Sequence, residues 1–244
     1  MELKGKNISF KYSSNDKYIL KDIDFSIDNS KIMGLVGDSG SGKTTLLKLI
    51  QGFYQPNRGS IKVGQLNLKE INPHLWRAKT GSVMQESFIF SDSIANNIAL
   101  NTDNIDTERL LQAAIMANAD EFITMLPLGY NTKIGMEGIG VSQGQRQRIL
   151  IARAIYKNPD YIFFDEATNS LDTTNERTIM NNLNEFYKGK TVVIVAHRLS
   201  TVMDADQIVV MKYGHIVEVG THHELVKKNG YYYTLVKSQL ELEK

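Results

Sequence analysis

A glycine-rich loop between an apolar strand and a helix constrains the fold of this chain more than any other feature. Residues 37–44 (GDSGSGKT) match the pattern G-x-x-x-x-G-K-[ST] without a gap. The apolar run Ile32–Val36 precedes the loop, and a helical pattern follows over residues 43–51 and ends at Gly52. A strand that passes through such a loop into a helix is the building unit of a parallel α/β sheet.

The residue types of this loop suit a phosphate ligand. Its glycines let successive backbone N–H groups surround an anion, and the N-terminus of the following helix adds a partial positive charge. Lys43 can reach the β- and γ-phosphates of a nucleotide, and the Thr44 hydroxyl can bind Mg²⁺. A chance match is disfavoured because both flanking elements are present. The predicted ATP-binding set from this segment is Gly37, Asp38, Ser39, Gly40, Ser41, Gly42, Lys43, Thr44 and Thr45.

A second apolar strand ends in an acidic pair. Residues 161–164 are apolar, and Asp165 and Glu166 follow them directly. Parallel α/β sheets hold their ligands at the carboxyl ends of strands, so Asp165 would belong to the Mg²⁺ shell. Glu166 could then polarise an attacking water. Without the phosphate loop, a solvated acidic pair would be the better interpretation of these two residues.

Three more residues are candidates for the same site. His197 follows the apolar segment 192–196 and could face a γ-phosphate. Gln85 ends a short apolar segment and could offer its amide oxygen to Mg²⁺ or to water. Tyr12 could stack on an adenine, although its alternation with Phe10 suits a core face equally well. Spacing alone leaves the structural and functional interpretations of all three open.

Apolar periodicity predicts the rest of the fold. We expect strands within residues 1–35, helical structure over 92–127, helices over 145–156 and 174–187, and a hairpin of 207–211 with 215–219. Continuous apolar strands that alternate with helices imply a mostly parallel sheet covered on both faces. The mainly helical block 87–157 lies between two sheet-forming halves and is the predicted subdomain.

Composition excludes several classes of protein. The 244 residues carry 28 basic and 27 acidic side chains, and a net charge of +1 gives no global attraction to nucleic acid. The absence of cysteine excludes disulfides and thiolate metal sites. The longest apolar runs are strand-sized, so we expect a soluble domain whose membrane spans, if it acts at a membrane, come from other segments.

Residues 141–148 (VSQGQRQR) add a Ser-x-Gly-Gln turn at a helix start, which suggests a second phosphate-facing surface. With this turn, the chain resembles the nucleotide-binding domain of ATP-binding cassette (ABC) transporters over about residues 2–240. The family motifs are matched by Tyr12 for the adenine-stacking residue, 37–45 for Walker A, Gln85 for the Q-loop, 141–145 for the signature, 162–166 for Walker B with the catalytic glutamate, 170–172 for the D-loop, and His197 for the switch histidine.

The resemblance implies a P-loop NTPase (RecA-like) α/β fold. It has a mostly parallel sheet core, an N-terminal antiparallel β subdomain and an inserted helical subdomain. We expect one domain over 1–244, with the core in 1–86 and 158–244 and the helical subdomain in 87–157. The implied catalytic residues are Lys43, Glu166 and His197, and the implied Mg²⁺ ligands are Thr44, Gln85 and Asp165.

In the family, two such domains pack head to tail with ATP between them. Each ATP would contact the loop of one copy and, in trans, Ser142, Gln143, Gly144 and Gln145 of the other. The resemblance thus implies ATP and Mg²⁺ as cofactors, and a second copy and transmembrane domains as partners. It implies no nucleic acid partner, and a place on the cytoplasmic face of the cell membrane.

Within the family, the exporter branch fits best. Residues 220–232 and the spacing of 135–138 resemble exporters, and residues 143–159 (QGQRQRILIARAIYKNP) resemble peptidase-containing exporters of bacteriocin-type peptides. Exporters of lipids or drugs, and non-transport ABC ATPases, remain alternatives. A P-loop kinase or GTPase is disfavoured by the signature. Because Met1 lies almost at the first strand, we expect a C-terminal domain of a longer polypeptide, or else a separate subunit.

Three residues depart from the family pattern. Gln143 stands where most members have glycine, which places a side chain beside the expected γ-phosphate site. Val141 replaces the common leucine. Met136 occupies the position of a glutamate that communicates with transmembrane segments in exporters, and Glu137 follows it.

Overall fold

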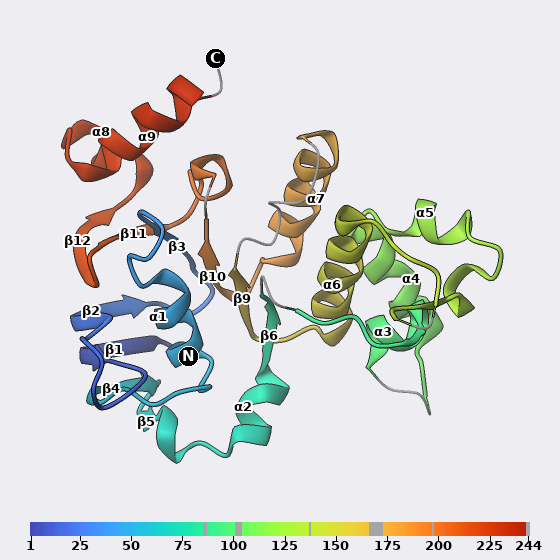
Figure 1. Cartoon of the computed structure of the whole chain (residues 1–244), viewed down its shortest axis with the longest axis horizontal. Coiled ribbons are helices and arrows are strands. Elements are labelled where there is room, and N and C mark those ends of the chain that lie inside the picture. The colour runs from blue at the N-terminus through green and yellow to red at the C-terminus, as the bar shows by residue number, and fades with distance from the viewer. Residues whose placement is uncertain (85–86, 101–103, 137, 166–172, 197, 243–244) are drawn as a thin grey trace.

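A six-stranded sheet forms the centre of the computed structural model, which describes residues 1–84, 87–100, 104–136, 138–165, 173–196 and 198–242 (Figure 1). The strand order is β12-β11-β3-β10-β9-β6. All neighbours are parallel except β12, which pairs antiparallel with β11. The strands are β3 (Ile32–Val36), β6 (Thr80–Val83), β9 (Tyr161–Asp165), β10 (Thr191–Val195), β11 (Gln207–Lys212) and β12 (His215–Gly220). The prediction of a mostly parallel sheet is confirmed.

Burial explains why the central strands read as continuous apolar runs. Every residue of β9 and β10 is buried, because both faces of the sheet are covered. One face packs on helix α1 (Lys43–Ile50) and on the second sheet, and the other packs on α6 (Gln143–Lys157) and α7 (Thr173–Phe186). The buried side chains thus form two hydrophobic clusters, one on each face of the sheet. Helix α1 belongs to one cluster and α6 to the other.

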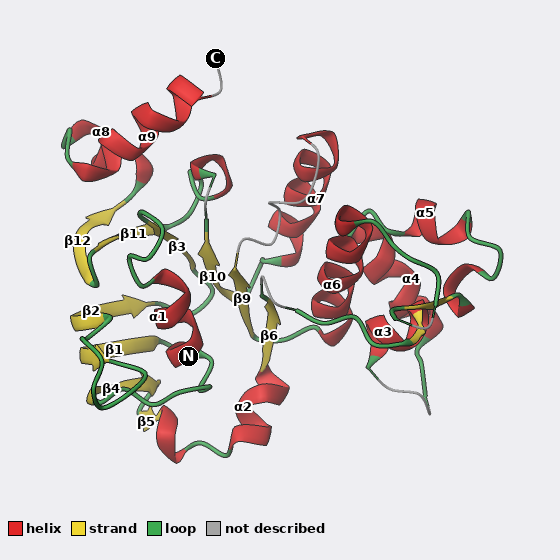
Figure 2. Ribbon diagram, in the orientation of Figure 1, coloured by secondary structure: helices red, strands yellow, loops and turns green. Residues whose placement is uncertain are grey.

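The second sheet is antiparallel, as predicted for the N-terminal part. Its order is β2-β1-β4-β5. Its strands are β1 (Leu3–Phe10), β2 (Leu20–Ile27), β4 (Arg58–Val63) and β5 (Leu66–Asn67). Its buried side chains alternate with exposed ones in β2 and β4, because only one face of this sheet meets the core. Figure 2 shows this sheet to one side of α1.

The prediction of helical structure over residues 92–127 needs correction. The segment opens with β7 (Asp92–Ser93), which pairs with β8 (Lys133–Ile134), and continues as α3 (Ile94–Ala99), α4 (Thr107–Met116) and α5 (Asp120–Thr124). Leu100 ends α3 with φ of 53°, and Asn118 lies between α4 and α5 with φ of 52°. These left-handed residues cannot continue a right-handed helix.

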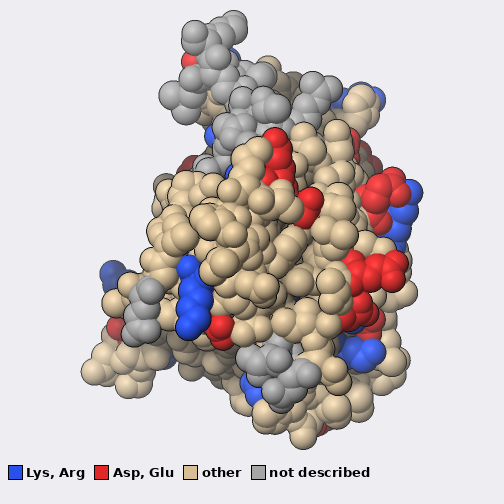
Figure 3. Space-filling view, turned by 90° about the vertical axis from the view of Figure 1, so that its right-hand side faces the viewer, with Lys and Arg blue, Asp and Glu red and all other residues tan. Residues whose placement is uncertain are grey.

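The remaining helices are short or peripheral. They are α2 (Pro73–Lys79), α8 (His222–Lys227), α9 (Tyr231–Leu242) and the 3₁₀ turns η1 (Leu68–Glu70), η2 (Gly129–Asn131) and η3 (Leu199–Thr201). None of the helices in the described ranges combines the length and apolarity that crossing a bilayer requires. Figure 3 views the molecule from the side where Figure 1 shows α3–α5, and most of that face is uncharged.

Candidate functional site

The loop between β3 and α1 has a backbone that only glycine suits at two positions. Gly37 and Gly42 have φ of 145° and 104°. A Cβ on Gly37 would lie 2.1 Å from the carbonyl oxygen of Met211, and one on Gly42 would lie 2.6 Å from Cδ2 of Leu20. The loop is therefore pressed between β11 and β2. This close packing fixes the turn whose N–H groups the sequence assigns to a phosphate.

Lys43 begins α1 and folds back over the loop. Its ammonium donates hydrogen bonds to the carbonyl oxygens of Gly37 (2.7 Å) and Asp38 (2.8 Å), and the residue is only 5% exposed. The positive charge is therefore held at the loop itself. Phosphate oxygens that entered the loop could replace these two carbonyls as acceptors, because an ammonium bonds more strongly to an anion than to a neutral oxygen.

Thr44 and Asp165 bring two oxygen ligands together from separate elements. The Thr44 hydroxyl donates to Oδ1 of Asp165 over 3.3 Å. Asp165 ends β9 and is 1% exposed, and β9 is two strands from β3 in the sheet. A hydroxyl and a carboxylate are the hard oxygen donors that Mg²⁺ prefers. The residues present therefore fit the predicted Mg²⁺ site, with Gln85 outside the described residues.

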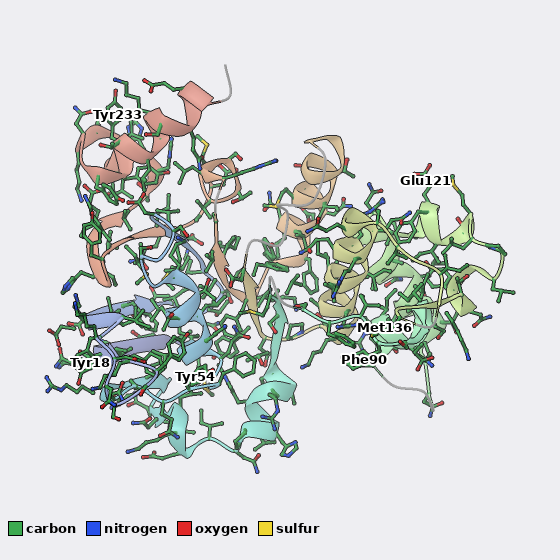
Figure 4. The ribbon with its side chains drawn as sticks, viewed as in Figure 1. Tyr18, Tyr54, Phe90, Glu121, Met136 and Tyr233 are labelled. Carbon is green, nitrogen blue, oxygen red and sulfur yellow. The ribbon has the colours of Figure 1, made fainter. Side chains whose placement is uncertain are left out.

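Tyr12 lies beside the loop helix with a partly open ring. Its hydroxyl is 3.2 Å from Oγ1 of Thr45, and the residue is 46% exposed. The ring meets those of Phe10 and Tyr54 edge to face at 5.0 Å and 5.2 Å. Sequence reasoning missed Tyr54, labelled in Figure 4, because it follows the helix α1 in a turn with no periodic pattern. The cluster fixes one edge of the Tyr12 ring and leaves part of it accessible.

The signature segment forms the N-terminus of α6. The helix begins at Gln143, two residues earlier than predicted, because Ser142 is its N-cap. The Ser142 hydroxyl accepts from the amide of Gln145 (3.2 Å), and the Gln145 side chain accepts from the Ser142 amide (2.9 Å). This capping box orders the turn. Gln143, the departure from the family pattern, is exposed at the first helical position.

The helices that follow the phosphate loop and the signature pack on opposite faces of the central sheet. The buried side chains of α1 belong to the hydrophobic cluster on one side of the central sheet, and those of α6 belong to the cluster on the other side. In Figure 1, the strands β9 and β10 lie between the two helices. The structure thus brings together Lys43, Thr44 and Asp165, and leaves Ser142 apart from them.

Several predicted residues lie outside the described part of the chain. These are Gln85, Glu137, Glu166, His197 and residues 170–172. Met136, which replaces the family's glutamate, is described and is 92% exposed. Its amide donates to Oγ of Ser91 (3.2 Å), and Figure 4 shows it in the same region as Phe90.

Arg153 is a contact residue that the sequence did not reveal. From α6, its guanidinium donates to the carbonyl oxygens of Asn97 (2.7 Å) and Phe88 (2.9 Å). Burial, with the charge of Arg146 as a smaller cause, lowers the pKa of Arg153 to about 10. The residue therefore stays charged at neutral pH and ties α6 to the segment that follows Gln85.

Comparison with known proteins agrees with this geometry. The family model described as ABC transporter matches residues 20–169. The chain is 46% identical over 245 residues to the toxin RTX-I translocation ATP-binding protein of Actinobacillus pleuropneumoniae, with 98% of this chain and 35% of that protein covered. It is 45% identical over 244 residues to the leukotoxin translocation ATP-binding protein LktB of Mannheimia haemolytica, with coverage of 98% and 34%. The chain thus spans about a third of the length of these curated relatives.

A solved structure is also similar over almost the whole chain. A bacterial Atm1-family ABC exporter with ATP bound matches with a TM-score of 0.94 and 35% identity, over 98% of this chain and 42% of that one. The predicted P-loop fold and exporter resemblance are confirmed by these matches. The chain belongs to the ABC transporter family, and over 98% of its length it is similar to an ABC exporter.

Proposed function

We propose that this chain works as a head-to-tail homodimer that hydrolyses ATP at two shared sites and drives export of a polypeptide. The observation that carries the proposal is the separation of its two phosphate-type surfaces. Helix α1, which follows the loop, and helix α6, which follows the signature, pack on opposite faces of the central sheet. One chain cannot use both on the same nucleotide, whereas two chains facing each other can.

The proposed site assigns a role to each described residue. Lys43 would leave the carbonyls of Gly37 and Asp38 to bind the β- and γ-phosphates. Thr44 and Asp165 would hold Mg²⁺, which when bound neutralises charge on these phosphates. The exposed part of the Tyr12 ring would stack on the adenine.

The catalytic step is assigned from the sequence. Glu166 would orient the attacking water, and His197 would contact the γ-phosphate. Gln85 would complete the Mg²⁺ shell. From the partner copy, Ser142 and Gly144 would present the N-terminus of α6 to the γ-phosphate, with Gln143 and Gln145 beside it. No redox chemistry is required, because hydrolysis only transfers a phosphoryl group to water.

The substrate and the partners follow from the relatives. The two curated relatives named above are toxin translocation proteins, so we propose a polypeptide as the exported substrate, with a bacteriocin-type peptide as the narrower form. These relatives are translocation proteins and the similar solved structure is an exporter, so we propose transmembrane domains as partners and the cytoplasmic face of a membrane as the place of this chain. The likeness to an Atm1-family exporter keeps a non-peptide substrate as the second candidate.

Dimerisation can be tested with a variant that binds ATP but hydrolyses it slowly. We expect Glu166→Gln to elute from a sizing column as a dimer with Mg-ATP and as a monomer without it. Adding Ser142→Arg should abolish the ATP-dependent dimer, because a bulky cation would obstruct the N-terminus of α6. Equal ATP binding by the monomers is the control. A dimer that survives Ser142→Arg would refute the assignment of α6 to the partner's nucleotide.

A further inference from the structure

Tyr231, the first residue of α9, contacts the phosphate loop, which lies near the other end of the sequence. The Tyr231 hydroxyl donates a hydrogen bond to Oδ2 of Asp38, the second residue of the loop. The two residues are 193 positions apart. Asp38 is the only acidic residue in the segment 37–45, which is otherwise suited to an anion. Tyr231 therefore binds the one side chain of this segment whose negative charge would repel a polyphosphate.

Tyr231 is held in place independently of Asp38. Its backbone amide donates to Oε1 of Glu218 on β12 (3.1 Å), and the amide of Tyr232 donates to Oε2 of the same carboxylate (2.7 Å). The ammonium of Lys212, at the end of β11, lies 4.1 Å from the centre of the Tyr231 ring. The backbone at the start of α9 is thus anchored by Glu218, and the ring lies against Lys212, both without the help of Asp38.

The hydroxyl is a donor at all physiological pH values. Burial, followed by the hydrogen bond to Asp38, raises the pKa of Tyr231 to about 12. The phenol therefore remains protonated and supplies its proton to the carboxylate. The Lys212 ammonium over the ring adds positive charge to the same region.

The backbone of Asp38 also belongs to the phosphate site. Its carbonyl oxygen accepts from the Lys43 ammonium (2.8 Å) and from the amide of Ser41 (3.2 Å). A freely rotating Asp38 carboxylate would sample positions nearer to Lys43 and to the phosphates. There it would compete for the ammonium and repel the nucleotide.

We propose that Tyr231 is a positioning residue for nucleotide binding, which holds the Asp38 carboxylate on the α9 side of the loop and so keeps its negative charge from the nucleotide phosphates. The inference rests on the proposed role of residues 37–44 as the phosphate site. It gives α9 a part in ATP affinity through the Asp38 carboxylate.

The test compares Tyr231→Phe with Tyr233→Phe. Tyr233, labelled in Figure 4, lies on the same helix and is 39% exposed. No hydrogen bond joins its hydroxyl to another of the described residues. By calorimetric titration with Mg-ATP at about 50 mM salt, Tyr231→Phe should raise Kd about threefold to fivefold, the range of a partly screened charge interaction. Tyr233→Phe should leave Kd unchanged, and kcat at saturating ATP should stay the same in both.

An electrostatic role makes predictions that a merely structural role does not. The effect of Tyr231→Phe should shrink at about 500 mM salt, and should be larger for ATP than for AMP, which carries less charge. In an Asp38→Asn background, Tyr231→Phe should change Kd by less than about 1.5-fold, because the charge it controls is absent. Equal effects of Tyr231→Phe with aspartate or asparagine at position 38 would overturn the proposal.

Lys43→Ala separates this inference from the proposed function. It should lose ATP affinity in every background, because the loop would lack its cation. If Lys43→Ala binds ATP like the unmodified chain, the assignment of the loop itself fails. If Lys43→Ala loses binding while Tyr231→Phe binds ATP with unchanged Kd at low salt, only the role of Tyr231 is refuted.

Discussion

Replacing Arg153 by methionine should be among the most damaging single changes in α6. Methionine keeps most of the stem but removes the guanidinium, so the carbonyl oxygens of Phe88 and Asn97 lose their donors. The part-buried carbonyl of Asn97 costs about 1–2 kcal/mol when it loses its donor, whereas water can take over the exposed carbonyl of Phe88. The lost contact of the guanidinium with the Phe90 ring, at 5.4 Å, adds about 0.5–1 kcal/mol. We expect Arg153→Met to lower the free energy of unfolding by about 2 kcal/mol.

Arg146 provides the matched control. It lies two turns earlier on α6 and donates to the carbonyl of Ser87 (3.0 Å), one residue before Phe88, but it is exposed. Water can take over that carbonyl when Arg146→Met removes the guanidinium, so the cost should stay below about 1 kcal/mol. Urea unfolding followed by circular dichroism measures both, and Arg153→Met should shift the midpoint by about 1 M.

The comparison refutes the reasoning if the two variants are equally stable. Arg153→Lys sharpens it, because lysine keeps the charge but cannot span both carbonyls with a planar fork. Its free energy of unfolding should fall between those of the unmodified chain and Arg153→Met. A lysine variant as stable as the unmodified chain would show that charge alone, and not the paired carbonyl contacts, holds α6 to residues 87–97.

Two further predictions concern the sheets. Gly59→Ala should lower the free energy of unfolding by about 2–4 kcal/mol, because φ is 80° and the new Cβ would lie 2.3 Å from two carbonyl oxygens of β1. Gly189→Ala is the control. Its φ is 77° but the space around it is open, so it should cost only about 1 kcal/mol in the same urea unfolding assay. Burial would raise the pKa of Asp206, but hydrogen bonds, first that from Lys31, lower it from 3.8. Its stabilisation is therefore present above pH 3.8 and lost as pH falls through the lower folded value, so Asp206→Asn should flatten the acid limb of the stability curve.

Local sequence patterns predict an element correctly where one short segment determines its own structure. The strands β9 and β10 were predictable because both are continuous apolar runs, and burial on both faces removes any alternation. The loop before α1 was predictable because its glycines, Lys43 and Thr44 have fixed spacing. The start of α6 was placed two residues late, although Ser142 and Gln145 form a capping box whose Ser-x-x-Gln spacing is readable in the sequence.

The remaining features depend on contacts between distant segments. Leu100 adopts a left-handed conformation at the end of α3, and nothing in its residue type signals that break. The strands β7 and β8 have two residues each, too few to show a period. The bond from Tyr231 to Asp38 joins the two halves of the chain, and no pattern near either residue points to the other.

The hydrogen bonds of Arg153 link α6 to the segment 87–88, and this link should affect the proposed dimer as well as the stability of the fold. Its 15 residues extend about 22 Å, from the capped Ser142 to the end of the helix. Arg146 and Arg153 both hold carbonyls of the segment 87–88, shortly after Gln85. A shift of that segment must therefore move the helix as a unit or break these bonds. In a Glu166→Gln background, Arg153→Lys should weaken ATP-driven dimerisation more than ATP binding by the monomer. Equal losses in both would mean that Arg153 only supports the fold.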